Sequence, residues 1–174
     1  MRKALVLGAA LAVTLGGAAL ALAADDDYGY GPPPATTTQT TTTTPIASPA
    51  ESYSFRATLG ARAEVPRPNA PAGAAGVFTA KVTEKQGRAT IRWTLSFRRL
   101  SGAAVAAHIH RGRPGVAGPV VVALCGPCRN GQNGRRVVDE QLAGAIRRGG
   151  HYVNVHTARN AAGEIRGQVR FVGR

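Results

Sequence analysis

The sequence predicts an all-β domain, an antiparallel sandwich or small barrel of about seven or eight strands with at most one short helix. Apolar and polar residues alternate strictly over long stretches of its second half, which is the period of a half-buried strand. The chain also holds 22 Gly and 11 Pro, whereas aromatic residues make up only 5%. This composition favours a turn-rich β fold over a helical bundle.

The first 23 residues have the features of a secretory signal peptide. Arg2 and Lys3 form a basic start, residues 4–22 are almost entirely apolar, and Ala21 and Ala23 supply the small residues of a cleavage site. The alternative is an uncleaved anchor, but a stretch composed mostly of Ala and Gly partitions weakly into lipid. With no second apolar stretch, we expect a secreted or extracytoplasmic protein without a membrane span after cleavage.

Residues 24–50 are predicted to be a disordered linker. They contain a run of prolines and a Thr-rich tract at 36–44. Such a segment has almost nothing to bury, so ordering it would cost entropy without return. The β domain is therefore expected to occupy residues 51–174.

Within that domain, the clearest strand is residues 88–98, in which Ala89, Ile91, Trp93, Leu95 and Phe97 share one face. The second clear case begins at Ser52, where every other residue up to Leu59 is apolar. Turn-rich segments at 66–71, 111–118 and 130–134 separate these strands from the others. Further strands are expected near residues 77–83, 105–110, 120–124, 152–157 and 164–172.

One short helix is expected after Asp139, whose side chain can cap it. Leu142 and Ile146 would share a face, and the Gly149-Gly150 pair would end the helix. The alternative for so short a segment is an irregular crossing loop.

The domain is strongly basic. The whole chain has a net charge of +13, and from residue 51 onward 20 Lys and Arg face 6 Asp and Glu. In an exported protein, such charge suits anionic cell-envelope polymers or an extracellular protein, and nucleic acid is not expected as a partner. The alternative is that the Arg excess is compositional and forms no single patch.

Three blocks of sequence resemble the CHRD domain, a module named after chordin. They are FRATLGARAEVP at 55–66, AHIHRG at 107–112 followed by GPVV at 118–121, and YVNVHT at 152–157 followed by GEIRGQ at 163–168. The resemblance implies an all-β extracellular module. In outline the domain is also similar to the Greek-key barrel of copper/zinc superoxide dismutases, which carry a His-x-His strand.

The His-x-His pair, His108 and His110, is a candidate metal site. Residues two apart on a strand share a face, and with Val105 and Ile109 pointing inward both imidazoles would point outward. Neutral imidazoles side by side are suited to Cu or Zn.

A hairpin of residues 152–156 and 164–168 would add further polar groups. Placing Val153, Val155 and Ile165 inside pairs His156 with Glu164 and Asn154 with Arg166, as an outward polar cluster. The sequence therefore predicts a metal site of His108, His110, His156 and Glu164. The alternative is that these groups form a structural polar network that ties strands and loops together.

The two cysteines, Cys125 and Cys128, enclose Gly-Pro. A turn sequence rather than a helix follows them, so we expect a local disulfide in an oxidising compartment. A thiol–disulfide function or a Cys-containing zinc site is the alternative. No residues form a recognisable catalytic arrangement.

The leading functional hypothesis is an exported, non-enzymatic binding or structural module with an Arg-rich surface. The second is a metal-binding domain for Cu or Zn, either dismutase-like or metal-sequestering. The third and weakest is the thiol–disulfide function.

Overall fold

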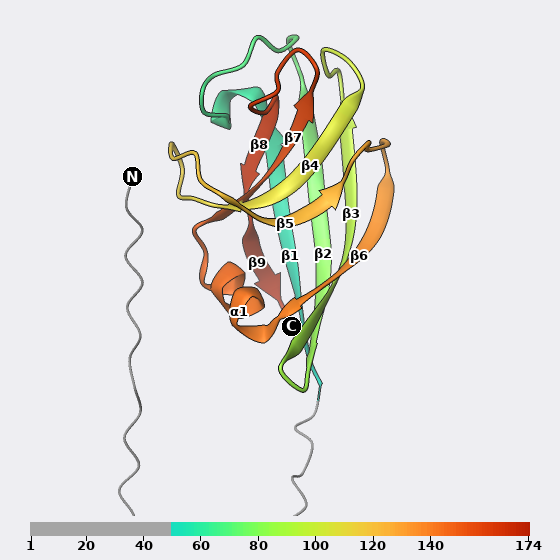
Figure 1. Ribbon diagram of the computed structural model, residues 1–174, viewed down its shortest axis with the longest axis vertical. Helices are drawn as coiled ribbons and strands as arrows, with labels where there is room; N and C mark the ends of the chain where they lie inside the picture. The colour runs from blue at the N-terminus through green and yellow to red at the C-terminus, as the bar shows by residue number, and fades with distance from the viewer. Residues whose placement is uncertain (1–49) are drawn as a thin grey trace, which may run out of the picture. The chain divides into compact units, whose positions relative to one another are not determined.

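The computed structural model describes residues 50–174, so the predicted signal peptide and nearly all of the predicted linker lie outside the described residues. A mainly β domain begins at residue 51 (Figure 1). Its elements, in chain order, are β1 (Glu51–Gly60), the 3-10 helix η1 (Ala61–Ala63), β2 (Ala75–Lys85), β3 (Arg88–Arg98), β4 (Ala104–Arg111), β5 (Val120–Cys125), β6 (Gln132–Asp139), α1 (Glu140–Arg148), β7 (His151–Thr157), β8 (Ile165–Gln168) and β9 (Arg170–Gly173).

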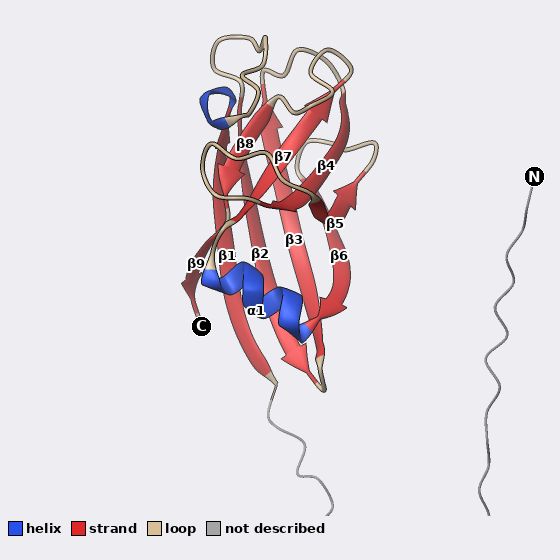
Figure 2. Cartoon of the chain, turned by 60° about the vertical axis from the view of Figure 1, so that its left-hand side comes forward, coloured by secondary structure: helices blue, strands red, loops and turns tan. Residues whose placement is uncertain are grey.

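The strands form one antiparallel sheet in the order β5-β4-β7-β8-β1-β2-β3-β6, with the short β9 paired to β1. This sheet curls into a nearly closed barrel (Figures 1 and 2), which confirms the predicted fold class and is compatible with a Greek-key barrel. The end strands β5 and β6 are bridged by the side chain of Arg136, which donates from Nε to the Ala123 carbonyl at 2.6 Å and from Nη2 to the Leu124 carbonyl at 2.5 Å.

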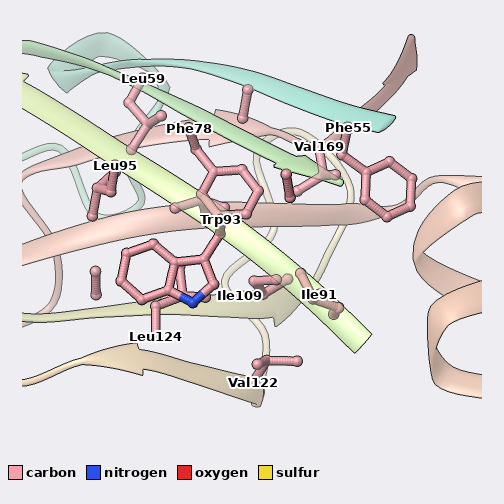
Figure 3. Packing of buried hydrophobic residues seen from close by; sticks show 14 of the residues in the cluster. Phe55, Leu59, Phe78, Ile91, Trp93, Leu95, Ile109, Val122, Leu124 and Val169 are labelled. Atoms are coloured by element: carbon pink, nitrogen blue, oxygen red, sulfur yellow. The ribbon is translucent and has the colours of Figure 1, made fainter. Parts of the chain in front are cut away.

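The alternating strands fill the barrel, as the sequence predicts. Ile91 and Leu95 of β3 are fully buried and Trp93 is 3% exposed, while Phe97 at the strand's end is only half-buried. On β1, Phe55 and the other apolar members of the alternation are likewise buried (Figure 3). Each large apolar side chain buried in this way contributes about 1.5–3 kcal/mol, so these two strands supply much of the core's stability.

Three parts of the strand pattern differ from the prediction. The single strand expected near residues 164–172 is divided into β8, which pairs with β7, and β9, which pairs with β1. Residues 130–134 were expected to form a turn, but β6 begins at Gln132 and continues to Asp139. Its residues are mostly exposed, because it is an end strand of the sheet, so no apolar alternation marks it. Val105 was expected to point inward, yet it is 45% exposed because the β4–β7 register shifts at this point.

The predicted helix is present as α1. The Asp139 carboxylate accepts a hydrogen bond from the Leu142 amide at 2.6 Å, and Gly149 follows the last turn with a positive φ. Ile146 is buried and Leu142 is half-buried, so this face packs against the barrel core. None of the helices between residues 50 and 174 is both long and apolar enough to cross a membrane.

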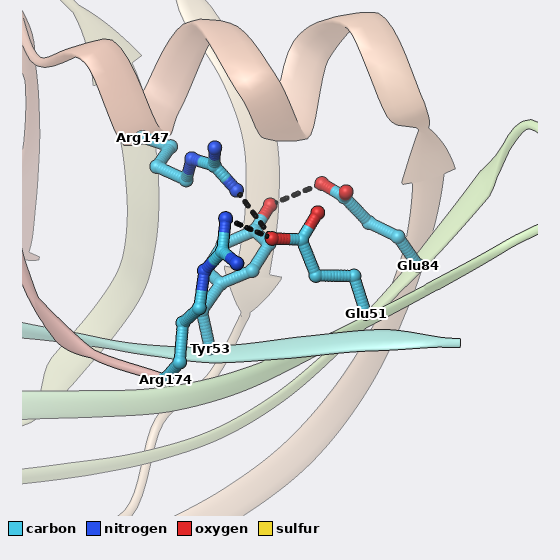
Figure 4. A network of polar contacts seen from close by, with 5 residues as sticks. All are labelled: Glu51, Tyr53, Glu84, Arg147 and Arg174. Atoms are coloured by element: carbon cyan, nitrogen blue, oxygen red, sulfur yellow. Dashed lines mark hydrogen bonds and ion pairs between the residues drawn. The ribbon is translucent and has the colours of Figure 1, made fainter. Parts of the chain in front are cut away.

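Polar contacts fasten α1 and the C-terminal residue to β1 (Figure 4). The Glu51 carboxylate pairs with Arg147 of α1 at 3.2 Å and with Arg174 at 2.6 Å. Beside them the Tyr53 hydroxyl donates to the Glu84 carboxylate, and burial together with that carboxylate raises the tyrosine pKa. The ion pairs are half exposed and each contributes at most about 1 kcal/mol, so they orient α1 more than they stabilise the domain.

Candidate metal centre

Three of the four histidines meet on the face of β4 and β7 that points away from the barrel core. Ala107 and Ile109 of β4 are buried in the core, so alternation turns His108 and His110 to the opposite face. On the neighbouring β7, His156 stands opposite Ala106, which is two residues before His108 on β4. The pairing of these two strands therefore brings the three imidazoles together.

The histidine nitrogens are close enough to share an ion. One ring nitrogen from each of His108, His110 and His156 lies within 4.8 Å of the other two. The nearest pair is His108 Nδ1 and His156 Nε2, 3.1 Å apart. Two nitrogens bound to one tetrahedral zinc at about 2.0–2.1 Å are roughly 3.3 Å apart. The histidine side chains would therefore have to shift by about 1 Å for all three nitrogens to bind one ion.

Backbone carbonyls fix the tautomers of two of the rings. His110 Nδ1 lies 2.8 Å from the Gly118 carbonyl, and His156 Nδ1 lies 2.9 Å from the Ala161 carbonyl. A carbonyl only accepts, so both Nδ1 atoms carry the proton and the Nε2 atom of each ring carries the lone pair. The lone pair of His156 Nε2 faces His108 Nδ1 at 3.1 Å. His110 Nε2 is buried and has no hydrogen-bond partner among the described residues. A ligand nitrogen backed by such a bond on the other side of its ring is the usual arrangement in metal sites.

Burial also keeps two of these rings neutral. It lowers the pKa of His108, and the neighbouring His156 and His110 lower that pKa further. Burial lowers the pKa of His156 as well, against the opposing effect of its hydrogen bond to the Ala161 carbonyl. Neutral imidazole is the form that binds a metal, so both rings are ready as ligands near neutral pH.

Tyr152 supports the site from β7, where it stands directly opposite His110. Its ring stacks on His110, with centroids 4.8 Å apart and an interplanar angle of 9°. Its hydroxyl accepts from the Gly118 amide at 3.2 Å, and the carbonyl of that same glycine holds His110. Tyr152 therefore contacts both the ligand and the loop that orients it.

The comparison with protein families decides what kind of domain presents this site. The CHRD domain model matches residues 55–169, which is most of the chain. The chain belongs to the CHRD family. Neither the curated proteins nor the solved structures contain a match to this chain. CHRD domains occur in extracellular proteins, and the family indicates a binding or structural module.

The hairpin register predicted for this CHRD domain is present. Val155 stands opposite Ile165 and Asn154 opposite Arg166. The members of this polar cluster lie on the face of the hairpin opposite the core, but they are shielded from solvent, because Asn154 and Arg166 are each 1% exposed and His156 is 9% exposed. The loop between β4 and β5 covers the cluster, and Arg166 Nη2 holds that loop by donating to the carbonyls of Arg113 and Val116, each at 2.9 Å.

Glu164 does not join the three histidines. It is fully buried, and its carboxylate accepts hydrogen bonds from Ser101, Thr157 and Asn160. Because β8 begins only at Ile165, the alternation assumed for the hairpin does not extend to Glu164. Burial would raise the pKa of this carboxyl, but the hydrogen bonds outweigh that effect and hold the pKa below its ordinary value. Glu164 thus ties the loop between β3 and β4 to the end of β7 and to the connection between β7 and β8.

Glu64 is a buried carboxylate beside Asn154 and Arg166, and it was not among the site residues predicted from the sequence. It is 4% exposed, and burial raises the pKa of its carboxyl, against the lowering effects of the Val65 amide, Arg166 and Asn154. A Cβ at residue 163 would lie 2.3 Å from Glu64 Oε2, and Gly163 has a φ of 134°, so only glycine fits there. Its position in the Glu-Val-Pro of the first CHRD block was the sequence feature that could have pointed to it.

The predicted disulfide between Cys125 and Cys128 is present. Cys125 ends β5, and the residues after Cys128 lead through a turn into β6 rather than opening a helix. The Cys128 amide donates to the Ala104 carbonyl at 2.9 Å, so the bridged loop is attached to the start of β4. The disulfide thus stiffens the connection beside the strand that carries His108 and His110.

Proposed function

We propose that this CHRD domain is an exported metal-binding module that holds one Zn(II) or Cu(II) ion through His108, His110 and His156. The convergence of three imidazole nitrogens within 4.8 Å of one another carries the proposal. Imidazole suits both ions, and three protein nitrogens leave a coordination position for water or another ligand.

The hydrogen bonds at the back of the rings support the same function. The Gly118 and Ala161 carbonyls accept from Nδ1 of His110 and His156, so Nε2 of each ring carries the lone pair, and loop-borne carbonyls of this kind set the direction of a ligand ring. His110 Nε2 is buried without a hydrogen-bond partner among the described residues, so its lone pair is available to an ion.

Export rests on the signal features of residues 1–23 and on the extracellular occurrence of the family. In that compartment a domain whose three histidines leave one coordination position free can sequester or deliver a transition metal.

A buried cation, Arg166, stands near the site. The Tyr152 ring lies 3.3 Å from the Arg166 guanidinium and stacks on His110, so this ring occupies the space between the cation and the ligand.

The test is metal uptake by the purified protein. Isothermal titration with ZnCl₂ and CuCl₂, followed by elemental analysis after desalting, should give one ion per chain. We expect each of His108→Gln, His110→Gln and His156→Gln to weaken binding at least about a hundredfold, because each removes a ligand.

His151→Gln is the matched control. His151 is 4% exposed and its Nδ1 also lies near a backbone carbonyl, that of Gly149 at 3.0 Å, but it is not part of the three-histidine group. This variant should bind as the parent does, and thermal melts of all four variants show which remain folded. Equal binding by the parent and a folded His110→Gln variant would refute the proposal.

A further inference from the structure

A row of cations crosses the outer face of the barrel on the side formed by β1, β2, β3 and β6. Lys81, Arg92 and Arg135 stand directly opposite one another on β2, β3 and β6. Their strand neighbours Val82 and Ile91 are buried, so the three cations point away from the core, and all three are exposed. With strands about 4.8 Å apart, the row is roughly 10 Å long.

No carboxylate of the described residues neutralises this row. Glu64, Glu84 and Glu164 are buried, and Glu51 pairs with Arg147 and Arg174. The remaining two carboxylates, Asp139 and Glu140, stand at the start of α1, where Asp139 caps the helix. Like charges set directly opposite one another on a sheet are destabilising, so counter-charges from outside the domain would relieve the repulsion within this row.

A shallow hollow of about 600 Å³ lies along the same face. Arg56, Lys81 and Arg92 line it together with uncharged polar side chains, namely Ser54, Thr79, Thr94 and Asn133. Hydroxyl and amide groups of this kind hydrogen-bond to sugar hydroxyls, while the cations bind sulfate, phosphate or carboxylate. No exposed aromatic ring lines the hollow to stack on a nucleic-acid base.

We propose that this outer face, defined by Arg56, Lys81, Arg92 and Arg135, binds an anionic polysaccharide that carries sulfate, phosphate or carboxylate groups. The face uses β1, β2, β3 and β6, whereas the three histidines are on β4 and β7, so the two sites are independent. The domain would attach to an anionic polymer through one face and present the histidine site from another.

Titration of the full-length protein with dextran sulfate, polygalacturonate and neutral dextran tests the proposal. We expect binding to both charged polymers at about 0.15 M salt and none to neutral dextran. Affinity should fall as salt rises, because counterions are released on binding. The triple variant Lys81→Gln/Arg92→Gln/Arg135→Gln should bind at least about tenfold more weakly, since three ionic contacts are lost.

A second triple variant with the same change in charge is the control. Arg62, Arg67 and Arg159 are exposed and lie outside the four strands of the proposed face, so their replacement by Gln should change affinity by less than about twofold. Equal losses in the two triples would show that net charge alone drives binding and would overturn the assignment. Stronger binding to a DNA duplex or to phosphatidylglycerol vesicles than to either charged polymer would overturn the choice of partner.

Discussion

His108 Nδ1 lies 3.1 Å from His156 Nε2, and the proton between them belongs to His108. His156 cannot supply it, because its own Nδ1 donates to the Ala161 carbonyl. In the proposed site these two nitrogens, which face each other, bind the metal. Coordination through His108 Nδ1 therefore requires the His108 proton to move to Nε2 of the same ring.

Tyr152→Phe should weaken zinc binding about tenfold, the lower end of the range for groups that orient a ligand. The change keeps the ring that stacks on His110 but removes the hydroxyl that holds the Gly118 amide. Competition titration against a zinc chelator measures the change in Kd. Tyr53→Phe is the control, because it removes a buried hydroxyl that is bonded to Glu84 instead. Equal zinc affinity in Tyr152→Phe and the parent would show that the loop does not orient His110.

Glu164→Gln should lower the free energy of unfolding near neutral pH by about 1.5–3 kcal/mol, the value of a hydrogen bond to a charged group. The folded pKa of Glu164 is below its ordinary value of 4.5, so the ionised carboxylate stabilises the fold fully above pH 4.5. That contribution is lost as the pH falls through the lowered folded pKa. Urea unfolding at a series of pH values should show the parent and the variant converging in acid.

Glu64→Gln should give the opposite trend. Burial raises the folded pKa of Glu64 above 4.5, so its contribution to stability is complete below pH 4.5 and is lost as the pH rises through the raised pKa. Gln resembles the protonated carboxyl, so parent and variant should be about equally stable in acid, and the parent should become the less stable of the two as the pH rises toward neutral. Parallel trends in the Glu64 and Glu164 variants would contradict the assigned environments of the two carboxyls.

Gly167→Ala should destabilise the domain by about 1–3 kcal/mol or more, because its new Cβ would lie 2.1 Å from the Thr58 carbonyl oxygen on β1. Gly60→Ala is the matched control, since no atom lies within 4 Å of a Cβ built there. Thermal unfolding of both variants measures the difference. Equal melting temperatures would contradict the close approach of β8 to β1.

The sequence was sufficient for the fold where strands are buried on one face and exposed on the other. The alternation around Trp93 and the hairpin that pairs Asn154 with Arg166 both follow from a period of two. β6 escaped prediction because it is an end strand whose residues, such as Arg135 and Arg136, are exposed on both sides. No apolar pattern marks a strand of that kind.

For the candidate site, the sequence could identify side chains but not their surroundings. Two histidines on one strand and a third on a hairpin were predictable as neighbours, and the structure brings them together. Glu164 was misplaced because its backbone leaves the strand pattern one residue before β8. The carbonyls of Gly118 and Ala161 could not be predicted, because every residue has a carbonyl and only the loop path aims these two.

Nitrogen-detected NMR of the histidine side chains, before and after one equivalent of ZnCl₂, tests metal binding most directly. Without metal, His110 and His156 should be Nδ1–H tautomers. With zinc, Nε2 of His110 and His156 and Nδ1 of His108 should shift, the His108 proton should move to Nε2, and His151 should be unchanged. Unchanged resonances for these three rings, or a response confined to His151, would contradict the proposed site.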